Sequence, residues 1–79
     1  MKIRVTRKFI NKGKKKSVES CPIALAIKDR FPGQYVKVYS DSAIIGDARY
    51  NLRRGMRFVE RFDAGKSVRP VTVELSDLC

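Results

Sequence analysis

Histidine and tryptophan are absent from the 79-residue chain, and cysteine occurs only twice, as Cys21 and Cys79. Without histidine, the chain lacks the commonest general base and the usual group that activates a serine or cysteine nucleophile. Two cysteines also fall short of the four ligands that a structural zinc site requires. We therefore expect a protein that is not an enzyme and that uses neither a metal nor another cofactor.

Long apolar runs are absent as well. None approaches the ~18 residues that cross a bilayer, and no signal-peptide core follows Met1. A secreted domain of this size usually carries several disulfide bridges, so two cysteines favour a reducing compartment. These absences predict a cytoplasmic protein with no membrane partner.

Acidic residues are missing from the first 16 positions, whereas the whole chain has 18 lysines and arginines, 8 acidic residues and a net charge of +10. A segment of one charge sign on an otherwise balanced domain often marks where an acidic partner docks. Nucleic acid is one such partner, because phosphates neutralised by basic side chains release counterions. The alternative is a solvated segment that only aids solubility. The basic residues of this segment are Lys2, Arg4, Arg7, Lys8, Lys12, Lys14, Lys15 and Lys16.

The pattern of apolar residues predicts one domain, residues 1–79, of the α+β class. Alternation predicts strands at 2–5, 35–39, 43–45, 48–52 and 71–75. Helical spacing and capping residues predict a short turn at 7–10 and helices at 22–31 and 53–64. We expect a small sheet of four to five mainly antiparallel strands with two helices packed on one face, in the order β-α-β-β-β-α-β.

Three local features refine this prediction. Residues 11–17 are too polar and too charged to pack, so they are expected to form a mobile basic loop. Pro70 indicates either an edge position or the start of the last strand. The buried face of the predicted helix 53–64 is expected to carry Leu52, Met56, Val59 and Phe62.

Arg54, Arg57 and Arg61 recur at helical spacing, so they should form a stripe on the exposed face of the predicted helix 53–64. Arginine favours bidentate recognition of phosphate or carboxylate groups. The alternative is a solvent face that acidic neighbours partly neutralise. The residues predicted to contact nucleic acid or another acidic partner are Arg7, Lys8, Lys14, Lys15, Lys16, Arg53, Arg54, Arg57 and Arg61.

Tyr35, Lys37 and Tyr39 alternate along the predicted strand 35–39 and should point away from the core. Two tyrosines that flank a lysine on a sheet form a stacking platform for unpaired bases, so Tyr35 and Tyr39 are the candidates for stacking. No motif typical of RNA-binding sheets accompanies them. The favoured interpretation is packing across strands against Tyr50 or beneath a covering segment.

Cys21 stands directly before Pro22, at the predicted start of a helix. A helix N-terminus and nearby lysines lower the pKa of a thiol and make it reactive. A buried thiol that acts as a small apolar side chain is the commoner case, and it is the interpretation that we favour.

The segments CPIALA, residues 21–26, and RFVERFDAGKSVRP, residues 57–70, resemble a family of short uncharacterised proteins of bacteriophages and prophages. The resemblance covers residues 1–75 and is weakest at the N-terminus. This chain departs from the family at Arg53, where members tend to have proline. The family has no assigned activity, so it implies no functional residues. It implies a small protein that acts inside an infected bacterium, where such proteins commonly bind nucleic acid or block a host protein.

Together these features predict a small basic binding protein that engages nucleic acid through a surface rich in lysine and arginine. The alternative is a phage-type inhibitor, such as an anti-CRISPR or another anti-defence factor, that binds and blocks a host protein through the same charges. In either case the chain is expected to be a monomer or a weak homodimer, since an exposed sheet edge can pair two copies. A phage-encoded chain would act in the cytoplasm of the bacterial host.

Overall fold

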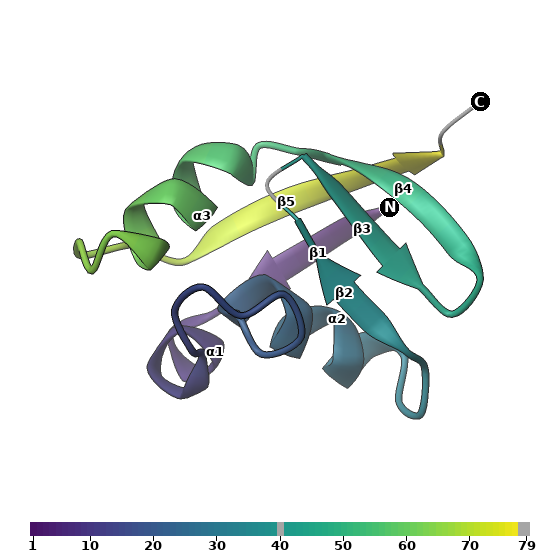
Figure 1. Ribbon diagram of the computed structural model, residues 1–79, viewed down its shortest axis with the longest axis horizontal. Helices are drawn as coiled ribbons and strands as arrows, with labels where there is room; N and C mark the ends of the chain where they lie inside the picture. The colour runs from purple at the N-terminus through teal and green to yellow at the C-terminus, as the bar shows by residue number, and fades with distance from the viewer. Residues whose placement is uncertain (40, 78–79) are drawn as a thin grey trace.

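Five antiparallel strands form one sheet in the computed structural model, which describes residues 1–39 and 41–77 (Figure 1). The strand order is β1-β5-β4-β3-β2. The predicted α+β class and the predicted order of elements are confirmed. The strands are β1 (Lys2–Val5), β2 (Val36–Val38), β3 (Ser42–Ile45), β4 (Ala48–Arg53) and β5 (Val71–Asp77). The helices are α1 (Arg7–Lys12), α2 (Pro22–Arg30) and α3 (Met56–Asp63).

The sheet curls around α2. Strands β1 and β2 stand at opposite ends of the strand order, yet α2 packs against both of them (Figure 1). The helix begins with Pro22, whose missing N–H suits the first turn, and the Cys21 Sγ atom accepts a hydrogen bond from the Ala24 backbone N–H at 3.4 Å. The buried residues of α2 are Pro22, Ile23, Ala24, Ala26 and Ile27.

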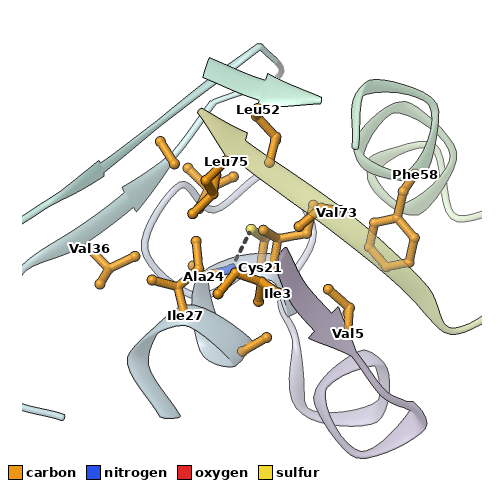
Figure 2. Close-up of a cluster of buried hydrophobic side chains, with 14 of the residues drawn as sticks. Ile3, Val5, Cys21, Ala24, Ile27, Val36, Leu52, Phe58, Val73 and Leu75 are labelled. Atoms are coloured by element: carbon orange, nitrogen blue, oxygen red, sulfur yellow. Dashed lines mark hydrogen bonds between the residues drawn. The ribbon is translucent and has the colours of Figure 1, made fainter. Parts of the chain in front are cut away.

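The core lies between the helices and the inner face of the sheet. Figure 2 shows Ile3, Val73 and Leu75, from neighbouring strands, gathered with Ala24 and Ile27 of α2. Each aliphatic side chain that is fully buried in this way stabilises the fold by about 1.5–3 kcal/mol relative to leaving it exposed. The buried strand residues of the inner face are Ile3, Val5, Val36, Val38, Ala43, Ile45, Leu52, Val73 and Leu75.

All the helices of the described chain pack on this inner side. Helix α1 contributes Phe9 and Ile10 to the core, and α3 contributes Phe58 and Phe62. The outer face of the sheet is therefore left without a helix in the part of the chain that the structure describes. The residues that alternate with the core positions are Lys2, Arg4, Lys37, Ser42, Ile44, Arg49, Asn51, Arg53, Thr72, Glu74 and Ser76.

Helix α3 begins later than predicted. Arg53 is the last residue of β4, and Arg54 follows with a φ of 64°. Gly55 then brings the chain so close to the sheet that an added Cβ would lie 2.9 Å from the Leu52 Cδ2 atom and 3.3 Å from the Val73 Cγ1 atom. The predicted helix start at Arg53 is wrong because β4 extends through this residue and the tight turn after it occupies the next two positions.

The buried face of α3 also differs from the prediction. Phe58 and Phe62, one helical turn apart, are buried and their rings stack with centroids 6.2 Å apart. Met56 is 48% exposed, so its assignment to the buried face is wrong, whereas Val59 is half-buried and packs against the core. The two aromatic rings determine which side of the helix turns inward, because they remove the most apolar surface from water.

Smaller differences concern the ends of segments. Asn11 and Lys12 belong to α1, so the loop begins only at Gly13. Pro70 precedes β5, which lies between β1 and β4. Of the two predicted alternatives, the start of a strand is therefore confirmed and the edge position is not. Within the described ranges, no helix is both long enough and apolar enough to cross a bilayer.

Candidate nucleic-acid interface

The lysine loop, residues 13–20, folds back on itself between α1 and α2. The Lys14 backbone N–H donates to the Ser20 carbonyl oxygen at 2.8 Å, which closes the loop. Gly13 approaches the first residue of α2 so closely that an added Cβ would stand 2.5 Å from two ring carbons of Pro22. The end of α1 and the start of α2 are therefore in tight contact, and the lysine loop begins and ends at this contact.

Two hydrogen bonds fasten the lysine loop to elements that are distant in the sequence. The Val38 N–H of β2 donates to the Val18 carbonyl oxygen at 2.8 Å, and the Lys16 N–H donates to the Asp63 Oδ1 atom of α3 at 2.8 Å. Lys16 has a φ of 57°, a left-handed conformation that residues other than glycine seldom adopt, and the bond to Asp63 helps to hold it. The loop backbone is thus anchored on two sides. The mobility predicted for residues 11–17 stays a prediction.

The segment after α3, residues 64–69, meets both the lysine loop and α1. The Lys15 Nζ atom lies 3.2 Å from the position that a Cβ on Gly65 would occupy. Arg7 of α1 donates from Nη1 to the Val68 carbonyl oxygen at 3.1 Å. These contacts bring basic residues from separate parts of the chain side by side.

An open hollow of about 470 Å³, lined by Arg61, Ser67 and Arg69, lies beside this junction. The Arg61 Nη2 atom donates to the Ser67 carbonyl oxygen at 3.3 Å. Because Arg61 and Arg7 donate these bonds to backbone carbonyl oxygens, which carry no formal charge, the bonds leave both guanidinium charges unneutralised. The hollow is therefore electrostatically suited to an anion such as a phosphate group.

We call this junction the basic surface, and all of its members are exposed: Arg7, Lys14, Lys15, Lys16, Arg61, Lys66 and Arg69. The carboxylate of Asp63 lies next to it and accepts the bond from the Lys16 N–H. Lys66 and Arg69 were not among the predicted contact residues, because those residues came from the N-terminal segment and the predicted helix only. The signal was present in the run GKSVR, residues 65–69, directly after that helix.

The other predicted contact residues lie elsewhere. Lys8 places its Nζ atom 5.7 Å from the centre of the neighbouring Phe9 ring on α1. Arg53 belongs to the outer face of the sheet. Arg54 precedes α3, so the predicted arginine stripe is wrong at Arg54 and only Arg57 and Arg61 lie on the helix. Arg57 lies on α3, as Arg61 of the basic surface does, and its side chain is exposed.

Tyr35 and Tyr39 flank β2 and are exposed, at 51% and 38%. The expected packing against Tyr50 is not found, because Tyr50 lies opposite Ala43 of β3 and packs against the core on the inner side of the sheet. Lys37 lies between the two tyrosines, and its Nζ atom is 5.4 Å from the centre of the Tyr35 ring. The pKa of Lys37 is raised, chiefly by the Tyr35 side chain, so this ammonium group stays charged at neutral pH.

A second hollow, of about 290 Å³, connects these tyrosines with the basic surface. It lies between the lysine loop, β2 and α3. Tyr39 and Lys16 both line it, and Val18 and Val59 contribute apolar walls. The end of β2 and the lysine loop are thus parts of one continuous surface.

Cys21 acts within the core. It is 5% exposed, and its Sγ atom accepts the N-terminal hydrogen bond of α2 that Figure 2 draws to Ala24. Burial raises the pKa of the Cys21 thiol, so the thiol keeps its proton at neutral pH. This environment matches the structural role that the sequence favours and not the reactive one.

Comparison with protein families, with curated proteins and with solved structures finds no match for this chain. The resemblance to bacteriophage and prophage proteins stays a prediction.

Proposed function

We propose that this chain is a small nucleic-acid-binding protein that contacts phosphate groups through the basic surface. The observation that carries the proposal is the hydrogen bond between the Lys16 N–H and Asp63, which joins residues 47 positions apart. This bond fastens the lysine loop to the end of α3, so that charges from three parts of the chain face one partner. No catalytic step is involved.

Contacts of this kind follow the charge of the phosphates and carry little information about base sequence. Each neutralised phosphate adds about 0.9 to the slope of log affinity against log salt for duplex DNA. If about four phosphates are contacted, affinity falls on the order of 100-fold between about 50 and 200 mM salt. A weak dependence on salt would therefore speak against the proposal.

The place of action follows from the same proposal. Nucleic acid is reached in the cytoplasm, and if the resemblance to phage and prophage proteins holds, that cytoplasm belongs to the bacterial host. The protein is proposed to act as a monomer or weak homodimer, because the basic surface lies within one chain and needs no second copy.

The test is a titration against fluorescent single-stranded and duplex DNA and RNA at two salt concentrations. We expect Arg69→Glu to weaken binding several-fold and to reduce the salt slope by about one, because it removes a phosphate contact. The matched control is Arg30→Glu at the end of α2, which changes the net charge equally but lies outside the basic surface. The control should lose clearly less affinity than Arg69→Glu.

Equal losses in the two variants would mean that only the net charge matters and would refute the basic surface as the site. Absence of binding to all four nucleic acids near physiological salt would refute the proposed function itself. The alternative inhibitor function would then be tested with host lysate treated with nuclease. It predicts a stoichiometric host protein bound to the wild-type chain and lost with Arg69→Glu.

A further inference from the structure

Two exposed aromatic side chains flank strand β2, and the second of them, Tyr39, also lines the hollow between the lysine loop, β2 and α3. Tyr35 and Tyr39 are 51% and 38% exposed, whereas the valines that alternate with them, Val36 and Val38, are only 2% and 3% exposed. Aromatic side chains bury about 150–250 Å² when they pack, so exposed rings on one strand forgo a large gain. Such a pair is a candidate for contact with a ligand.

Two of the three side chains next to the rings on the outer face of the sheet are positively charged. The register places Ile44 of β3 opposite Lys37, and Arg49 of β4 opposite Ile44. Lys37 interacts with the Tyr35 ring at 5.4 Å from its centre, a cation–π distance. Aromatic rings beside cations favour a ligand that is both aromatic and negatively charged, which describes a nucleotide.

The hollow beside Tyr39 connects the end of β2 with the lysine loop, which belongs to the basic surface. Its volume of about 290 Å³ is close to the ~300 Å³ of the smallest ligand pockets. Its walls include the apolar side chains of Val18 and Val59. Lys16 lies at the same hollow together with Asp63, whose carboxylate accepts a hydrogen bond from the Lys16 N–H. A base that enters it against Tyr39 leaves its phosphate next to the lysine loop.

We propose that β2 and the hollow beside Tyr39 bind single-stranded nucleic acid, with unpaired bases stacked on Tyr35 and Tyr39 and phosphates held by Lys37 and Lys16. This inference rests on the proposed function, because it names the form of nucleic acid that the basic surface holds. Stacking on tyrosine tolerates every base, since each base has a π-face, so the preference concerns strandedness and not sequence.

The spacing of the rings favours an extended single strand. Tyr35 and Tyr39 are four residues apart, so their Cα atoms are separated by about 13 Å along an extended backbone. Neighbouring bases in a nucleic-acid helix stand only about 3.4 Å apart and stack on one another, so two of them do not reach both rings. A single strand whose bases are splayed apart can reach both rings, and the faces of its bases are free to stack on them.

The test compares wild-type protein with two double variants at one fixed salt concentration. The probes are a labelled oligonucleotide of mixed sequence, as DNA and as RNA, and the matching duplexes. We expect wild-type protein to prefer the single strands. The Tyr35→Leu, Tyr39→Leu variant should lose roughly 5- to 100-fold in single-strand affinity for each stacked ring. The Tyr35→Phe, Tyr39→Phe variant keeps both rings and should bind within about twofold of wild type.

Intrinsic fluorescence gives a second measurement on the unmodified protein. The chain has no tryptophan and three tyrosines, so its emission reports on Tyr35, Tyr39 and the inward Tyr50. Stacking of bases on the first two should quench much of this emission when single strands bind. This measurement does not depend on whether the leucine variant folds.

Two sets of results would overturn the inference. Equal binding of single strands and duplexes by wild type, or unchanged single-strand affinity in a folded leucine variant, would remove the stacking site and leave the basic surface in place. Failure of wild-type protein to bind any of the probes would refute the proposed function and this inference together. A preference for DNA or RNA alone, with the tyrosine effects intact, supports the inference and identifies the natural strand.

Discussion

Replacement of Gly13 by alanine would test the tight contact between the lysine loop and α2. Gly13 has φ −69° and ψ 149°, an extended conformation that alanine adopts without strain. The obstacle is steric, because the new Cβ would stand 2.5 Å from the Cγ and Cδ atoms of Pro22 and 2.8 Å from its nitrogen. Pro22 is fully buried, and its ring is closed onto its own backbone, so it cannot rotate away.

Two opposing effects determine the size of the change. Alanine restricts the unfolded chain more than glycine does, which stabilises the fold by about 0.4–1 kcal/mol. Overpacking of a well-packed interior costs about 1–3 kcal/mol. The steric effect is the larger one, so we expect a net loss of about 1–2 kcal/mol in the free energy of unfolding. For a domain of this size, that lowers the melting temperature by about 5–15 °C.

Urea and thermal unfolding followed by circular dichroism measure this loss, and a double-mutant cycle identifies its cause. Pro22→Ala removes the ring atoms that the new Cβ would strike. In the Pro22→Ala background, Gly13→Ala should therefore cost clearly less, with only the 2.8 Å contact to the backbone nitrogen of residue 22 remaining. If Gly13→Ala is as stable as wild type, or if its cost is the same with and without the Pro22 ring, the steric argument is refuted.

Two further predictions concern the core. Leu75→Ala should lower the free energy of unfolding by about 2–5 kcal/mol, because Leu75 is only 1% exposed; Met56→Ala, at a residue that is 48% exposed, should cost much less, and equal losses in urea unfolding would contradict the described face of α3. Burial raises the pKa of Cys21, so the unfolded state loses its proton first, above about pH 8.5. Stability should be full below that pH and fall as the pH rises, and a series of urea titrations from neutral to alkaline pH should show that Cys21→Ala flattens the decline.

The alternation of side chains was sufficient to predict the strands and their order along the chain, but not their order in the sheet. Val36 and Val38, like Ile3 and Val5, are buried at every second position, and period two has no other simple explanation. The start of α3 was not predictable in this way. It depends on how closely Gly55 approaches other elements of the fold, which no local pattern contains.

The candidate site was predicted only in part for the same reason. The charges of the lysine loop are evident in the sequence, and they form part of the basic surface. Their partners across the surface depend on the bond from Lys16 to Asp63, between positions 47 residues apart. Lys66 and Arg69 follow a helix in a segment without periodicity, so their place beside Arg7 is a consequence of tertiary packing alone.

The position of β5 determines when this protein can fold. β5 lies between β1 and β4, and the backbone N–H of Leu75 donates to the Met1 carbonyl oxygen at 2.7 Å. A ribosome releases residues 71–77 after every other strand of the described chain, so until then β1 has no strand to pair with and β4 lacks one of its two neighbours. The sheet is therefore completed only after β5 has left the ribosome. During that interval the nascent chain exposes apolar strands, and it is then that chaperones and other nascent chains compete for it.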